Sequence, residues 1–113
     1  MHEASIAQNV LDIAINTATE NSAIKINKVC LKIGQLTAIE ENSLKFAFDA
    51  LKEDTMAANA ELLIEHIPIV GKCNNCGKKD TYSEMFFSCS NCGSYKMEIL
   101  SGEELSIKEI EVD

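Results

Sequence analysis

Residues 73–93 read CNNCGKKDTYSEMFFSCSNCG and contain four of the five cysteines of this 113-residue chain. The cysteines form two C-x2-C pairs separated by 12 residues, and a glycine follows each pair. Each pair can form a tight turn in which two thiolates converge, because glycine accepts the open backbone conformation that such a turn requires. Two such turns at this separation indicate a tetrahedral metal site formed by Cys73, Cys76, Cys89 and Cys92.

Zinc is the expected occupant of this four-cysteine site, in a structural role. Four thiolates leave no open coordination position for a substrate or a catalytic water. The segment holds too few large apolar residues to fold alone, and metal binding can supply the missing folding free energy. A rubredoxin-like iron electron carrier is an alternative, since C-x-x-C-G turns serve both metals. A zinc ribbon that binds nucleic acid or transcription machinery is another.

The charge balance argues against nucleic acid as a partner. The chain carries 18 acidic residues and 10 basic ones, for a net charge of −8, and every basic residue is lysine. Phosphate backbones are bound by clustered cations, most specifically by arginine. We also expect a cytoplasmic protein, because no apolar run approaches the roughly 20 residues that span a bilayer and no secretory signal is visible. The sequence shows no nucleophile–base pair of the kind that enzymes use, so we do not expect an enzyme.

The sequence on both sides of the cysteine segment predicts an α+β fold. Apolar residues recur at helical spacing in two stretches, and they alternate as in half-buried strands in three others. We expect two helices packed on a small three-stranded sheet, with a zinc-ribbon-like four-cysteine domain inserted between two strands. The expected helices are residues 4–20 and 37–51, the expected strands are residues 23–34, 61–70 and 97–112, and the expected domains are residues 1–70 plus 98–113 and residues 71–97.

Two local details of these elements can also be predicted. In the first strand, Ile24 and Ile26 and then Val29 fall on the apolar side, so the alternation slips by one residue, which indicates a bulge. At the start of the second helix, Thr37 and Glu40 have the spacing of a capping box.

The first three residues, MHE, form a second candidate metal site. Met1 is expected to remain because His2 is large, which leaves a free α-amine at the start of the chain. That amine, the backbone nitrogen and imidazole of His2, and the backbone nitrogen of Glu3 can form a planar set of four nitrogens. Ni(II) and Cu(II) prefer this geometry. In the alternative interpretation His2 is a solvated residue before a helix, and Glu3 only interacts with the helix dipole.

The chain resembles the HypA/HybF family of nickel-insertion accessory proteins for [NiFe]-hydrogenase maturation. The resemblance covers essentially the full length and lies in four stretches: MHE at 1–3, IGQLTAIEENSLKFAF at 33–48, the two C-x-x-C-G turns, and GEELSIKEIEV at 102–112. It implies that Met1, His2 and Glu3 bind Ni(II) as transferred cargo and that the four cysteines hold a structural Zn(II). Residues 1–70 plus 98–113 would then be the nickel-binding domain and residues 71–97 the zinc-binding domain.

The resemblance also implies partners for the chain. These are a nickel-handling maturation GTPase, the [NiFe]-hydrogenase large subunit and, in some organisms, urease maturation proteins. A homodimer is left open. An acidic residue near the start of the second helix sometimes joins the nickel site in relatives, and Glu40 is the matching position. Cys30 is expected to be a spectator or part of an interface and not a ligand, and His66 is expected to lie at the surface or to pack against its neighbours.

Overall fold

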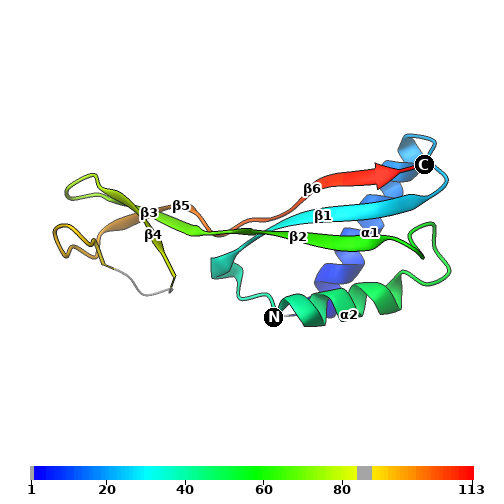
Figure 1. Cartoon of the computed structure of the whole chain (residues 1–113), viewed down its shortest axis with the longest axis horizontal. Coiled ribbons are helices and arrows are strands. Elements are labelled where there is room, and N and C mark those ends of the chain that lie inside the picture. Colours follow the sequence, from blue (N-terminus) through cyan, green and yellow to red (C-terminus); the bar gives the residue numbers. More distant parts are fainter. Residues whose placement is uncertain (1, 84–87) are drawn as a thin grey trace. The chain divides into compact units, whose positions relative to one another are not determined.

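The structure is a computed structural model that describes residues 2–83 and 88–113 (Figure 1). It divides into two compact units. The first contains Met1–Leu31, Ile39–Glu65 and Ser106–Asp113, and the second contains Lys32–Ala38 and His66–Leu105. The elements in chain order are α1 (Glu3–Glu20), β1 (Ile26–Gly34), a short 3-10 helix (Gln35–Thr37), α2 (Glu41–Leu51), β2 (Glu61–Ile67), β3 (Ile69–Cys73), β4 (Lys79–Tyr82), β5 (Met97–Ser101) and β6 (Leu105–Val112).

The first unit combines the two helices with a sheet of strand order β2-β1-β6 (Figure 1). β1 and β6 run antiparallel, because the Asp113 amide donates to the Lys25 carbonyl at 2.9 Å and Lys28 forms an ion pair with Glu111 at 3.9 Å. The helices contact each other and bury one face each, as the spacing of their apolar residues predicts. The core residues are Ala7, Val10, Leu11, Ala14 and Ala18 of α1, Leu44 and Phe48 of α2, and Ile26, Val29 and Leu31 of β1.

The second unit is built on a separate antiparallel sheet of strand order β4-β3-β5. Gly71, on the central strand, leaves space for two side chains of the neighbouring strands, since a Cβ there would lie 3.1 Å from Met97 Cε and 3.2 Å from Tyr82 Cε2. The ladder between β3 and β5 is irregular between Val70 and Gly71.

Gly34 and Gly102 form a close backbone contact in the second unit. A Cβ on Gly34 would lie 2.1 Å from the carbonyl carbon and 2.1 Å from the carbonyl oxygen of Gly102. Gly102 has a φ of +116°, and its carbonyl accepts a 2.8 Å hydrogen bond from the amide of Leu36. The absence of a side chain on Gly34 therefore lets the end of β1 meet the turn between β5 and β6.

The α+β class is confirmed, and so is the pair of helices. Two expected strands are wrong in detail. The region at 61–70 contains β2 and the start of β3, the region at 97–112 contains β5 and β6, and in each case the two strands belong to different sheets. The predicted insert at 71–97 lies within the second unit, whose bounds are wider. Among the described helices, none is long and apolar enough to cross a membrane.

Burial along β1 shows the expected slip in alternation, since Ile26 and Val29 are both fully buried although they are three residues apart. Ile24 differs from its prediction. It precedes β1, its amide donates to the Asp113 carbonyl at 2.8 Å, and its side chain is 82% exposed. Backbone pairing at this end of the sheet therefore continues past the last residue that the core covers.

Candidate metal centre

The two C-x-x-C-G segments fold into turns of the same geometry. The Gly77 amide donates to the Cys73 carbonyl at 2.8 Å, and the Gly93 amide donates to the Cys89 carbonyl at 2.9 Å. Both glycines are in the left-handed region, with φ of +82° and +76°. The predicted role of the glycine after each cysteine pair is thus visible in the backbone, since a left-handed residue closes each turn.

The turns bring four sulfur atoms together, all within 4.8 Å of one another. The Sγ atoms of Cys73 and Cys92 are 3.6 Å apart, and those of Cys76 and Cys89 are 3.5 Å apart. A disulfide needs about 2.05 Å, whereas the edge of a tetrahedron with Zn–S bonds of about 2.3 Å is about 3.8 Å. The donor set therefore fits a tetrahedral ion that prefers thiolates.

The two turns also provide amide hydrogens for the buried sulfurs. Cys73 Sγ accepts bonds from the amides of the second and third residues after it, at 3.3 and 3.4 Å. Cys89 Sγ accepts the equivalent pair at 3.4 and 3.4 Å. Outer hydrogen bonds of this kind orient the atoms that bind a metal.

The exposed sulfurs, those of Cys76 and Cys92, are reached by side-chain amides instead. Asn91 Nδ2 lies 3.6 Å from Cys76 Sγ, and Asn75 Nδ2 lies 3.5 Å from Cys92 Sγ. The bond from Asn91, followed by the backbone amide of Lys78, lowers the pKa of the Cys76 thiol to about 6. The bond from Asn75 likewise lowers the pKa of Cys92. Sequence reasoning missed both asparagines, although each precedes the second cysteine of its pair.

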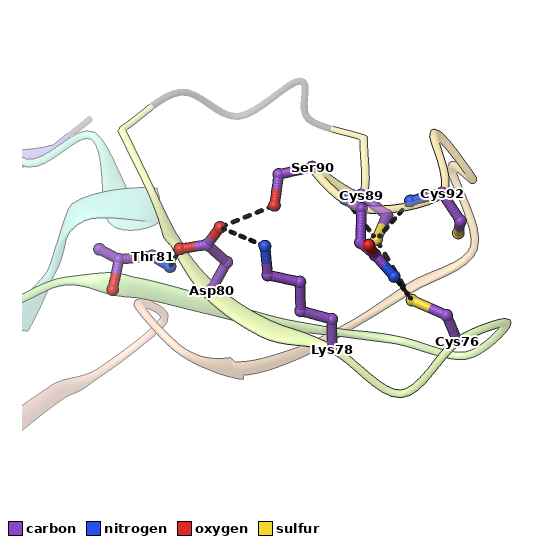
Figure 2. A network of polar contacts seen from close by, with 8 residues as sticks. Cys76, Lys78, Asp80, Thr81, Cys89, Ser90 and Cys92 are labelled. Atoms are coloured by element: carbon purple, nitrogen blue, oxygen red, sulfur yellow. Dashed lines mark hydrogen bonds and ion pairs between the residues drawn. The ribbon is translucent and has the colours of Figure 1, made fainter.

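Asp80 connects β4 to the second turn (Figure 2). Its Oδ2 atom accepts a 2.8 Å bond from the Ser90 hydroxyl and lies 3.9 Å from Lys78 Nζ, and its Oδ1 atom accepts a 2.8 Å bond from the Thr81 amide. The Ser90 and Thr81 hydrogen bonds, with the nearby ammonium, hold the pKa of Asp80 below its usual value. The turn that carries Cys89 is thus joined to the strand that follows the first turn by a contact that involves no sulfur.

The four cysteines are the one group of three or more Cys, His, Asp or Glu residues that converges closely enough to hold a metal ion, within residues 2–83 and 88–113. Cys30 is half-buried on β1 and His66 is exposed on β2, and neither belongs to this group.

The amino-terminal candidate site is described only in part, because Met1 lies outside the described residues. His2 is exposed and occupies the N-cap position of α1, where its side chain makes no capping bond. Glu3 is the first residue of α1, and its Oε2 atom accepts a 3.3 Å bond from the backbone amide of Glu40. The structure therefore brings together Glu3 and Glu40, two of the residues that the sequence singled out.

Glu40 caps α2, but not through the predicted capping box. It is itself the N-cap residue, and its carboxylate accepts the backbone amide of Ser43, which lowers the pKa of Glu40. Thr37 instead ends the 3-10 helix, and its hydroxyl donates to the Gly34 carbonyl at 2.9 Å. The helix consequently begins at Glu41, four residues later than the sequence predicted.

Comparison with known proteins gives consistent results along the whole chain. A family model described as "Hydrogenase/urease nickel incorporation, metallochaperone, hypA" matches residues 1–112. The hydrogenase maturation factor HypA of Desulfatibacillum aliphaticivorans is 42% identical, over 99% of this chain and 87% of that protein. That of Geobacter metallireducens is 39% identical, over 100% of both.

Solved structures agree on the fold. The solution structure of the Ni metallochaperone HypA from Helicobacter pylori aligns with a TM-score of 0.70 and 24% identity, and covers 99% of this chain and 97% of that one. A second, titled "Solution structure of HypA protein", gives a TM-score of 0.74 and 24% identity over 100% and 97%.

Proposed function

The chain belongs to the HypA family of nickel metallochaperones for hydrogenase maturation, and we propose that it binds Ni(II) at its own amino terminus and passes it to a maturing [NiFe]-hydrogenase. The proposed donors are the α-amine of Met1, the backbone nitrogen and imidazole of His2, and the backbone nitrogen of Glu3. The observation that carries the proposal is the placement of His2, exposed and immediately before α1 with no capping bond.

The start of a helix is compatible with such a donor set. The first amide groups of a helix have no intrahelical acceptor, so the loss of their protons breaks no helical hydrogen bond. The helix dipole disfavours a bare cation at this end. However, two deprotonated amides carry two negative charges that cancel those of Ni(II), so a nearly neutral complex has little interaction with the dipole. Binding must release protons, and acidification or competing ligands of a partner would then promote release.

The four cysteines are proposed to hold Zn(II) in a structural role. When bound, zinc would cross-link the two turns and stabilise a segment with few buried side chains. A planar nitrogen site and a tetrahedral thiolate site would sort nickel from zinc by geometry. We accordingly assign nickel binding to residues 1–70 plus 98–113 and zinc binding to residues 71–97.

Family membership supports the remaining assignments. We propose that the partners are a nickel-handling maturation GTPase and the hydrogenase large subunit, with urease maturation proteins as further partners. The proposed location is the cytoplasm, where the chain acts as a carrier and not as an enzyme.

Nickel titration of two forms of the protein tests the amino-terminal site. One form has its native terminus, and the other carries a few extra residues before Met1, which move the α-amine away without changing the fold. We expect tight binding and the absorption band of planar Ni(II) only in the native form. His2→Ala is the matched variant, which removes one donor and should weaken binding. Circular dichroism checks that each form is folded, and equal nickel affinity in the native and extended forms would falsify the proposal.

A further inference from the structure

The two cysteine turns are related by an offset of 16 residues, and the relationship extends beyond the sulfurs. Cys73, Asn75, Cys76 and Gly77 correspond to Cys89, Asn91, Cys92 and Gly93. Amide-to-carbonyl bonds, left-handed glycines and amide-to-sulfur bonds occur in both copies with nearly the same geometry. Each copy contains one buried and one exposed cysteine, so the cluster has two sheltered sulfurs and two that face solvent.

The two turns are not independent of each other, because the asparagine side chain of each turn donates to a sulfur of the opposite turn. The buried sulfur of each turn receives hydrogen bonds from backbone amides of its own turn. The exposed sulfur receives its side-chain donor from the other turn: Asn75 donates to Cys92 at 3.5 Å, and Asn91 donates to Cys76 at 3.6 Å.

We propose that Asn75 and Asn91 are positioning residues that hold the exposed thiolate of the opposite turn on the metal and thereby slow metal release. This inference rests on the four-cysteine zinc site proposed above. It assigns the two asparagines a role in metal retention, whereas the zinc assignment itself needs only the cysteines.

The physical reason is that a metal-bound thiolate leaves the metal when another species attacks the lone pairs of its sulfur that face solvent. A proton, a competing ligand or an oxidant reaches a sulfur from the solvent side, which here is the side of Cys76 and Cys92. An N–H donor stabilises the negative charge of that sulfur against protonation and fixes its direction, and outer hydrogen bonds generally orient metal ligands in this way. Because the donors cross between turns, each also opposes separation of the two turns, which must occur before both pairs release the ion.

Zinc release to an excess of chelator measures the effect. Asn75→Ala and Asn91→Ala should each release zinc about 10-fold faster than the wild type, because the roughly 10–100-fold loss of metal affinity on removal of outer hydrogen bonds is expected to appear as faster dissociation. Asn74→Ala is the matched control. It removes the same side chain one position earlier, and within the described contacts that side chain donates to no sulfur, so the wild-type rate is expected.

The isosteric variants Asn75→Asp and Asn91→Asp separate an electrostatic role from a packing role. Aspartate has the shape of asparagine but turns a carboxylate oxygen toward a thiolate. If the amide donor matters, each Asp variant should release zinc faster than the corresponding Ala variant. If an Asp variant releases zinc no faster than the wild type, the amide donor contributes nothing to retention, and the inference is overturned.

Alkylation of the zinc-loaded protein gives a readout at single residues. With iodoacetamide and mass spectrometry, Asn75→Ala should increase labelling of Cys92, and Asn91→Ala should increase labelling of Cys76. An increase confined to the cysteine of the mutated turn, or no increase at all, contradicts the crossed arrangement.

Failure of this inference can be told apart from failure of the zinc site. If the wild type holds no zinc, or if Cys73→Ser leaves the zinc content unchanged, the site itself is wrong. If the wild type holds one zinc and the asparagine variants release it at the wild-type rate, only the present inference fails. If the variants do not fold, NMR of the wild-type protein loaded with 113Cd tests the inference instead. Scalar coupling between the metal and the side-chain amide protons of Asn75 and Asn91 supports the inference, and its absence overturns it.

Discussion

The carboxylate of Glu3 accepts a hydrogen bond from the backbone amide of Glu40 at 3.3 Å, across 37 residues of sequence. The contact joins the first residue of α1 to the N-cap residue of α2. The donor proposed for nickel at Glu3 is its backbone nitrogen, so its carboxylate can keep this contact when the metal is bound. The first residue of α1 is thus anchored through a side chain that the proposed planar nitrogen set does not use.

Glu3→Ala and Glu3→Gln test the anchor. Ala removes both the acceptor and the charge at the start of α1, whereas Gln keeps an acceptor oxygen. We expect Ala to lower the free energy of unfolding by about 0.5–1.5 kcal/mol and Gln to lower it less. Urea unfolding followed by circular dichroism measures both, and equal losses would mean that the contact with Glu40 contributes nothing.

Acidification should weaken the start of α2 through Glu40. The Ser43 amide lowers the pKa of Glu40 below the usual 4.5, so the unfolded chain takes up this proton at a higher pH than the folded chain does. The contribution of Glu40 is therefore fully present above about pH 4.5 and disappears as the pH falls through the folded pKa. The Tm of the wild type should exceed that of Glu40→Gln by more at pH 6 than at pH 3.5, and a difference that is constant with pH contradicts this origin.

Phe48 and Phe46 form a matched pair on α2. Phe48 is fully buried in the core, whereas Phe46 is 77% exposed. Phe48→Ala should lower the free energy of unfolding by about 3–5 kcal/mol, because it removes buried surface and leaves a cavity. Phe46→Ala should change it by no more than about 0.5 kcal/mol. Chemical denaturation of both variants checks the contrast, and a large loss in Phe46→Ala would show that this face is covered in solution.

Gly34→Ala should be far more damaging than Gly77→Ala. A Cβ on Gly34 would overlap the backbone of Gly102, so either the end of β1 or the following turn must move, at a cost above about 3 kcal/mol. A Cβ on Gly77 meets nothing within 4 Å, and only its φ of +82° opposes the substitution, by roughly 1–2 kcal/mol. Thermal unfolding of the two zinc-loaded variants measures which substitution lowers the Tm more. A smaller decrease for Gly34→Ala than for Gly77→Ala would contradict the prediction.

Metal removal should unfold the second unit locally and leave the first intact. Within residues 71–97 the buried side chains that the structure describes are Cys73 and Cys89 alone, whereas the first unit has a core built from both helices. After chelation we expect the helical circular dichroism to persist and amide NMR signals from residues 66–105 to collapse. Loss of the helical signal would show that the two units unfold together.

The sequence allowed prediction of the parts that local pattern determines. The helical spacing of Val10, Leu11 and Ala14 indicates which face of α1 is buried, and the slip after Ile26 is visible in the order of apolar residues. The two cysteine pairs, with their glycines, predict the convergence of four sulfurs, because each turn is a local structure and a metal site needs both.

The remaining features depend on contacts between distant residues. Alternation continues on both sides of Gly102, so the pattern alone does not reveal that residues 97–112 form two strands, which pair with different sheets. Thr37 and Glu40 could both cap a helix, and the hydrogen bond from the Ser43 amide to the Glu40 carboxylate shows that Glu40 does. From sequence, an asparagine in a turn is interpreted as a residue that favours the turn. The hydrogen bonds of Asn75 and Asn91 to sulfur depend on the position of the opposite turn, which the local sequence does not reveal.

The division into two units has a consequence for dissecting the molecule. The chain passes from one unit to the other four times, after Leu31, Ala38, Glu65 and Leu105. A fragment that spans only residues 66–105 would lack Lys32–Ala38, including Gly34 and the Leu36 amide that bonds to Gly102. Neither unit is one uninterrupted segment, so a single protease cut at any of the four passages leaves the units covalently joined through the other three.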